Sequence, residues 1–149
     1  MMQHKLFQIM DANLNRLREG LRVCEDIARF TMTDRGIAKL LKTIRHKATE
    51  TLLDSQKQPL KKFILARDTQ KDALKFIDFK KQKSVDVNTI FMANIERVKE
   101  SLRVLEECSK ILDEGISRKY RKLRFDTYCA EKRAVKRHGI VKYDADRDC

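Results

Sequence analysis

The sequence predicts an all-α protein, and three observations lead to that class. Apolar residues recur at spacings of three and four along most of the 149 residues, as on one face of a helix. Glycine and proline, which interrupt helices, occur only four times and once. The segment 11–30, DANLNRLREGLRVCEDIARF, returns 81 positions later at 92–111 as MANIERVKESLRVLEECSKI. We therefore expect two duplicated helical hairpins, related by a pseudo-two-fold axis, in a four-helix bundle-like domain with a short connecting segment.

The first half is expected to contain two long helices. The first runs from residue 6 or 11 to residue 30, and a turn at residues 33–36 supplies the N-cap of the second. The second helix ends before Pro59, because proline has no backbone N–H to continue it. Residues 61–66, KKFILA, form a short apolar run that is either extended or half a helix.

The second half follows a connecting excursion at 67–84, which carries a short amphipathic piece at 73–79. Its first helix is expected from about residue 87 to 112, where Gly115 breaks it, and its second from about 117 to 138. The candidates for the N-cap of the first of these helices are Ser84, Asp86 and Asn88. One helical domain is therefore expected over 1–138, with repeat halves of about 6–56 and 86–137, followed by a charged mobile tail at 139–149.

Composition narrows the class of partner. The net charge of +12 favours polyanions, namely nucleic acid, acidic lipid or a phosphorylated small molecule, although a solubilising helix face would look the same. No apolar run approaches the ~18 residues of a membrane span, so we expect no membrane partner and a cytoplasmic location. The four cysteines are scattered without a CxxC pair, which favours reduced structural thiols.

The duplication preserves polar residues as well as apolar ones. Three of the eight identical pairs are Asn13/Asn94, Arg16/Arg97 and Glu19/Glu100. Packing alone needs only similar volume and polarity, so it does not explain this identity. A helical wheel places Asn13 and Arg16 inside the apolar arc, Glu19 at its edge and Glu25 on the wetter side. Since a buried guanidinium needs an anionic partner, we expect a polar site or a required polar network.

A second polar cluster lies off the long helices, at Ala66-Arg67-Asp68-Thr69 and Asp72. Arg67 could fork onto a phosphate, and Asp68 or Asp72 could hold Mg²⁺. The same residues also make an ordinary capped turn, and the pattern alone leaves both interpretations open.

Several motifs together resemble one known family. They are DANLNRLREGLRVCEDIARF at 11–30, Arg45-His46, ARDTxxD at 66–72, ANIERVKESLRVLEE at 93–107 and YxxxRFxxYxxE at 120–131. In this order they resemble the small single-function hydroxymethylpyrimidine phosphate kinase, a helical domain found alone or fused ahead of thiamine phosphate synthase in some bacteria. The resemblance covers residues 9–133. Ala73-Leu74 stands where such domains show a glycine, and the synthase domain is absent, so a standalone form is expected.

The resemblance implies transfer of the ATP γ-phosphoryl group to hydroxymethylpyrimidine phosphate, in thiamine biosynthesis, with Mg²⁺ and ATP. The acceptor phosphate is already ionised, so positioning by arginines and Mg²⁺ would suffice. The expected catalytic residues are Arg16, Arg67, Asp68 and Arg97. The expected substrate- or nucleotide-binding residues are Asn13, Glu19, Arg45, Asn94, Glu100 and Arg124. The expected metal ligands are Asp68 and Asp72.

Two other interpretations stay open at this point. One is a basic helical binding module for nucleic acid or a partner protein, without catalysis. The other is a helical regulatory partner of a separate thiamine phosphate synthase. The resemblance leaves open a functional link to that enzyme. The sequence leaves a homo-oligomer open.

Overall fold

The computed structural model describes residues 1–56, 60–68, 70–71 and 85–140, and this part of the chain is helical, without any strand. The elements are α1 (Met2–Asp26), the π-helix η1 (Ile27–Thr31), α2 (Arg35–Gln56), α3 (Leu60–Leu65), α4 (Val87–Leu112) and α5 (Glu114–His138). The predicted all-α class is confirmed. The predicted piece at 73–79, Pro59 and most of the predicted tail lie outside the described residues.

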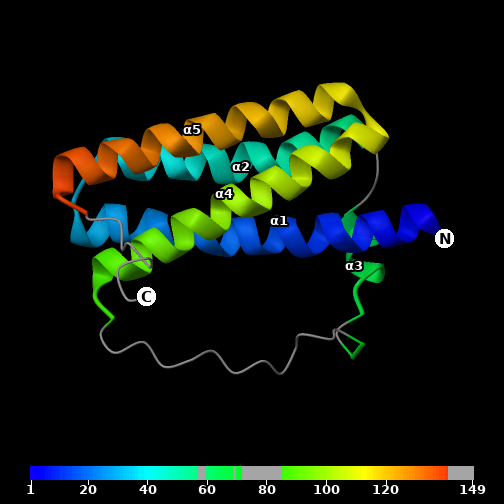
Figure 1. Ribbon diagram of the computed structural model, residues 1–149, viewed down its shortest axis with the longest axis horizontal. Helices are drawn as coiled ribbons and strands as arrows, with labels where there is room; N and C mark the ends of the chain where they lie inside the picture. The colour runs from blue at the N-terminus through cyan, green and yellow to red at the C-terminus, as the bar shows by residue number, and fades with distance from the viewer. Residues whose placement is uncertain (57–59, 69, 72–84, 141–149) are drawn as a thin grey trace, which may run out of the picture.

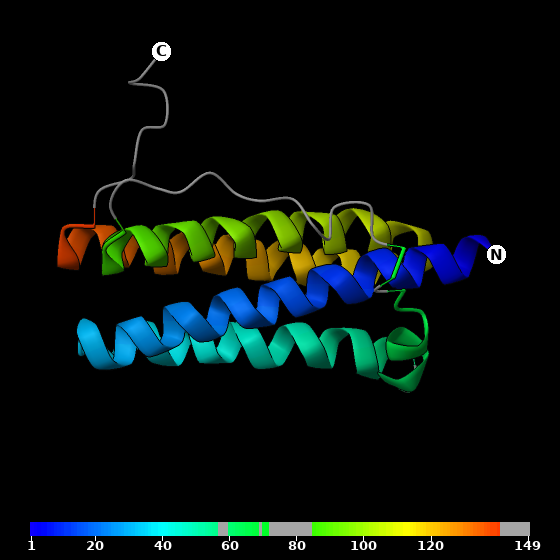
Figure 2. The same cartoon turned by 90° about the horizontal axis from the view of Figure 1, so that it is seen from below.

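The four long helices form a bundle in which α1 packs on α2 and α4, and α5 packs on the same two helices. Figure 1 shows α1 and α4 running in opposite directions across each other, with α5 and α2 beside them. Seen from below, in Figure 2, α1 lies between α2 and the α4–α5 pair. The short helix α3 packs against α1. The buried hydroxyl of Tyr120 on α5 donates to the carbonyl of Ala48 on α2 at 3.0 Å, which joins the two hairpins.

The apolar seam of both copies of the repeat forms the core. The predicted seam residues Leu14, Leu17, Leu21, Ile95, Val98 and Leu102 are all buried. The glycine of the first copy, Gly20, lies in close contact with α4. A Cβ at Gly20 would lie 3.0 Å from Val98 Cγ2 and 3.1 Å from the carbonyl oxygen of Asn94. The lack of a side chain therefore allows the backbones of the two repeated helices to meet.

The helix ends differ from the prediction in two places. The first helix begins at Met2, because Leu6 and Phe7 are buried and Phe7 packs edge-on against Phe63 of α3, with ring centroids 5.0 Å apart. The prediction that Gly115 interrupts the helical structure is wrong, because Gly115 lies inside α5. The break occurs at Asp113, which is extended and accepts from the backbone N–H of Ile116 at 3.1 Å.

The remaining ends agree with the sequence. Asp86 caps α4 by accepting from the backbone N–H of Thr89 at 2.7 Å, and α4 has the predicted bounds. Asp34 caps α2 by accepting from the N–H of Ile37 at 3.0 Å. The run KKFILA falls mostly in the helix α3, which settles the choice between helix and extended chain. None of the described helices combines the length and apolar character that crossing a membrane requires.

Candidate functional site

The repeated arginines Arg16 and Arg97 lie on the surface, which corrects the prediction that they point into the core. Both side chains are exposed, whereas Asn13 is buried and Asn94 half-buried. The seam through Leu17 and Val98 closes the contact between α1 and α4, so the neighbouring arginines stay at its solvent edge. A helical wheel gives the direction of each side chain but not how much of the helix surface the neighbouring helices cover. The long aliphatic stem of arginine also lets its charged group reach water.

The repeated asparagines make the same bond in both copies. The Asn13 amide donates to the carbonyl of Ile9 at 2.9 Å, and the Asn94 amide donates to the carbonyl of Ile90 at 2.8 Å. Arg97 adds a long contact of 3.4 Å to the side-chain oxygen of Asn94. The expectation that these polar residues form hydrogen bonds is met for the asparagines and Arg97, within their own helices.

Arg45 and Arg124, the predicted binding residues of the second helix in each hairpin, occupy matching ion pairs. Nε and Nη2 of Arg45 lie 3.1 and 3.0 Å from Oε2 of Glu25. The same two atoms of Arg124 lie 2.9 Å from Oε2 of Glu106. Both carboxylates are buried, which corrects the prediction that Glu25 faces water. Each pair fastens the two helices of one hairpin, and a substrate-binding role for the arginines stays a prediction.

The loop after α3 is tied to α1 by a residue that the sequence analysis did not single out as a site residue. Asp11 is buried and accepts a forked pair of bonds from Arg67, through Nε and Nη2. The hydrogen bond to Asp11 raises the pKa of Arg67 above its ordinary value. The two residues are far apart in the sequence, and only the position of Asp11 at the start of the repeated segment marks it.

Asp68 forms the capped turn that the sequence left open. Its Oδ1 accepts from the backbone N–H groups of Gln70 and Lys71, at 3.2 and 3.1 Å. Asp72 lies outside the described residues. Across the part of the chain that the structure describes, no three His, Cys, Asp or Glu residues gather as a metal site. The metal roles of Asp68 and Asp72 therefore stay predictions.

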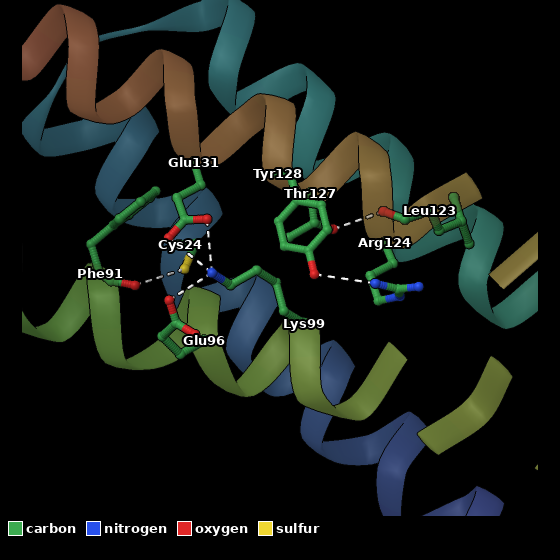
Figure 3. A network of polar contacts seen from close by, with 9 residues as sticks. All are labelled: Cys24, Phe91, Glu96, Lys99, Leu123, Arg124, Thr127, Tyr128 and Glu131. Atoms are coloured by element: carbon green, nitrogen blue, oxygen red, sulfur yellow. Dashed lines mark hydrogen bonds and ion pairs between the residues drawn. The ribbon is translucent and has the colours of Figure 1, made fainter. Parts of the chain in front are cut away.

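The second hairpin carries a polar network that the first lacks (Figure 3). The amine of the buried Lys99 lies 2.6 Å from Glu96 and 2.8 Å from Glu131, and 5.4 Å from the ring centre of Tyr128. Burial lowers the pKa of Lys99, but the bonds to Glu131 and Glu96 outweigh it, so the pKa lies above its ordinary value. Tyr128 also accepts from Arg124 at 3.2 Å.

This network makes the two halves chemically different, because the counterpart of Lys99 in the first copy is Arg18, which is exposed. Figure 3 also shows Cys24, whose buried thiol donates to the carbonyl of Phe91 across the α1–α4 contact at 3.5 Å. Burial raises the pKa of Cys24. A protonated thiol is a poor nucleophile and metal ligand, in keeping with the predicted structural role.

A family match accounts for the order of these motifs. Residues 8–133 match the family described as the ThiD2 family, which includes both hairpins and the loop between them. The chain belongs to the ThiD2 family. No solved structure matches it.

Three curated relatives of this ThiD2-family chain share a name. The thiamine-phosphate synthase of Synechocystis sp. is 36% identical over 125 residues, which are 83% of this chain and 34% of the relative. The thiamine-phosphate synthase of Nostoc punctiforme is 30% identical over 142 residues, 93% of this chain and 38% of the relative. That of Rhodopirellula baltica is 32% identical over 124 residues, 83% of this chain and 32% of the relative. The chain thus spans about a third of the length of these curated relatives.

These names correct the predicted activity. The relatives are named for thiamine-phosphate synthesis, and not as kinases that act on hydroxymethylpyrimidine phosphate, so that part of the prediction is wrong. The alternative of a basic binding module without catalysis has no support either, because the relatives bear the name of an enzyme.

Proposed function

We propose that this chain is a helical domain of thiamine biosynthesis that binds a phosphorylated pyrimidine precursor and works with a thiamine-phosphate synthase. The family match over 8–133 and the name shared by the relatives support the pathway. The chain corresponds to about a third of those relatives. The proposal therefore gives these residues only the part that handles the anionic precursor, and it does not assign the synthase activity to them.

One observation supports the anionic ligand. Three arginine pairs recur between the halves, namely Arg16/Arg97, Arg22/Arg103 and Arg45/Arg124. The last two pairs are each bound to carboxylates, as in Arg22 to Asp26 at 3.6 Å and Arg103 to Glu107 at 3.0 Å. Among the described residues, Arg16 and Arg97 have no carboxylate partner, although both are exposed on the two contacting helices α1 and α4.

An arginine that recurs in both halves without a carboxylate partner within the protein is suited to bind an anionic ligand. Its fork binds phosphate in a bidentate manner, which a lysine cannot do. The Asn13 and Asn94 bonds to their own helices hold the surrounding surface in place, and the exposed Glu19 and Glu100 border it on the next turn. We place the phosphate of the precursor on Arg16 and Arg97.

Calorimetric titration with hydroxymethylpyrimidine phosphate and with free hydroxymethylpyrimidine tests this proposal. The phosphorylated compound should bind and the free alcohol should bind far more weakly, because unpaired, desolvated guanidinium groups are costly. Mg²⁺ and ATP, which the resemblance implies, are added in separate titrations, and strengthening of the complex by either would support its part in the site. Equal binding of both compounds would overturn the proposal.

Matched variants locate the site. The double variant R16Q/R97Q should weaken binding of hydroxymethylpyrimidine phosphate by about tenfold per arginine, the value of a charged hydrogen bond. The control R18Q/R118Q removes two exposed charges elsewhere and should bind as the wild type does. The link to the synthase is tested in a bacterium whose thiamine-phosphate synthase lacks the segment that this chain matches. Expression of this chain should restore growth without thiamine, and R16Q/R97Q should restore it poorly.

A further inference from the structure

The turn between α1 and α2 is built differently from the corresponding turn between α4 and α5. The repeat runs at an offset of 81 up to residues 30 and 111, but the matching arginines Arg45 and Arg124 are 79 apart. The first turn is therefore two residues longer. It contains the π-helix η1, whereas in the second hairpin Asp113 alone separates α4 from α5.

Two features of the longer turn carry a conformational cost. The first is η1 itself, where the N–H of Met32 bonds to the carbonyl of Ile27 at 3.0 Å; π-helical turns are rare and occur frequently at functional sites. The second is Thr33, which has a φ of 51°, in the left-handed region that β-branched residues avoid. Such strain persists where the surroundings impose it, and it concentrates at ligand sites.

The longer turn leaves a depression of about 590 Å³, lined by Arg29, Thr33, Arg35, Ala38 and Lys39. This volume is in the range of small-molecule sites. Three of the five lining residues are cations, and all three are exposed. Arg29 lies over the ring of Phe30, at 4.8 Å from its centre. Within the described ranges no carboxylate pairs with any of the three cations.

The acid within this turn, Asp34, already has other partners. Oδ1 of Asp34 accepts from Ile37, and its Oδ2 lies 3.0 Å from His138 and 3.3 Å from Arg137. The second hairpin balances its charges at the corresponding place. Lys110, the counterpart of Arg29, pairs with Glu107 at 2.8 Å, Asp113 stands in the turn, and Glu114 begins α5. The first turn keeps one of these acids, because Asp34 caps α2 as Asp113 caps α5. It has Arg35 where the second turn has Glu114, and Arg29 has no carboxylate partner among the described residues.

We propose that this depression binds a second anion, the phosphate or diphosphate group of a small molecule. The depression is separate from Arg16, because Arg29, in the η1 that follows α1, lies about 20 Å from Arg16 along the axis at ~1.5 Å per residue. Three guanidinium and ammonium groups around one hollow suit a ligand with two or more negative charges, because each can donate a charge-assisted hydrogen bond. The proposal stands whether or not Arg16 and Arg97 hold the pyrimidine precursor.

Calorimetric titration with inorganic pyrophosphate, at constant ionic strength, tests the site in the full chain. The wild type should bind saturably, and the double variant R35S/K39S should bind at least about tenfold more weakly. The control R118S/R121S removes the same charge from exposed positions of α5, including the counterpart of Lys39, and should bind as the wild type does. The single variant R29S serves as a second probe that leaves α2 unchanged.

The outcomes separate the alternatives. Absence of saturable binding by the wild type, or equal loss in R35S/K39S and R118S/R121S, would overturn the proposal in favour of general surface charge. Loss of pyrophosphate binding in R16Q/R97Q but not in R35S/K39S or R29S would also overturn it, because the anion would then lie at the other site. A short single-stranded DNA that binds with the same variant dependence would show a nucleic-acid surface instead. Binding of hydroxymethylpyrimidine phosphate to R35S/K39S should be unchanged, so the two proposals fail independently.

Discussion

Arg45 reaches across from α2 to the buried carboxylate of Glu25 on α1, with Nε and Nη2 3.1 and 3.0 Å from the same oxygen. Arg124 and Glu106 repeat this pair in the second hairpin, at 2.9 Å for both nitrogens. The recurrence shows that the duplication copied a helix-to-helix ion pair together with the apolar seam. It also gives each hairpin a fixed register, because a shift of one turn would leave both charges unpaired.

The first prediction follows from that pair. Glu25→Gln should lower the free energy of unfolding by about 2–4 kcal/mol, because it leaves a largely buried guanidinium without its counter-ion. Urea unfolding measures the change. Glu19→Gln, at an exposed position of the same helix, should have little effect. A similar loss in both variants would mean that the pair does not hold the hairpin.

The second prediction concerns the close approach at Gly20. A Cβ there meets Val98 at 3.0 Å and the backbone of Asn94 at 3.1 Å, so Gly20→Ala should separate α1 and α4 slightly. Overpacking costs about 1–3 kcal/mol and outweighs the gain of up to ~1 kcal/mol in helix propensity. Gly36→Ala is the control, since its Cβ would meet only the side chains of Asp34, at 3.4 Å, and Arg137, at 3.8 Å. Thermal unfolding should place Gly20→Ala below the wild type and Gly36→Ala near it.

The third prediction concerns acid stability. The hydrogen bond from His138, with smaller contributions from Ile37 and Arg137, lowers the pKa of Asp34 to about 2. A carboxyl group whose pKa is lowered by folding stabilises the protein above its unfolded pKa, and this contribution is lost as the pH falls through the folded value. The wild type should therefore lose an increment of stability between about pH 4 and pH 2 that Asp34→Asn does not lose.

Asparagine keeps the N-cap of α2, so the comparison isolates the charge. Urea unfolding of both proteins across this pH range provides the measurement. Parallel curves for the wild type and Asp34→Asn would contradict the prediction, because they would place the acid sensitivity in other carboxylates.

The fourth prediction separates two roles of Arg67. Its fork onto Asp11 fixes the loop to α1, and the resemblance also assigns it to phosphate binding. If both roles hold, Arg67→Ala should weaken binding of hydroxymethylpyrimidine phosphate more than Asp11→Asn does, although both remove the same fork. Calorimetric titration of the two variants decides this. Equal losses would limit Arg67 to a structural role.

Local features of the structure could be predicted from the sequence to a large extent. The seam through Leu14, Leu17 and Leu21 follows from helical periodicity, which is a property of neighbouring residues. Capping acts over three residues, so the sequence predicts a cap among Ser84, Asp86 and Asn88, and the structure selects Asp86. The prediction places the break between the last two helices at Gly115, whereas the structure has it at Asp113. The sequence shows a residue type that breaks helices but not which residue adopts the extended conformation.

The sequence by itself determined the helical class, the duplicated hairpin and the polar residues that recur with it, because periodicity and repetition are written along the chain. Only the tertiary structure decided which of those polar residues are paired. Glu25 became buried because α2 brings Arg45 to it, while Arg16 stayed exposed because no described element covers its edge of α1. Asp11 and Arg67 meet only after α3 folds back onto α1. A wheel gives each side chain an angle, but packing decides which angles are covered.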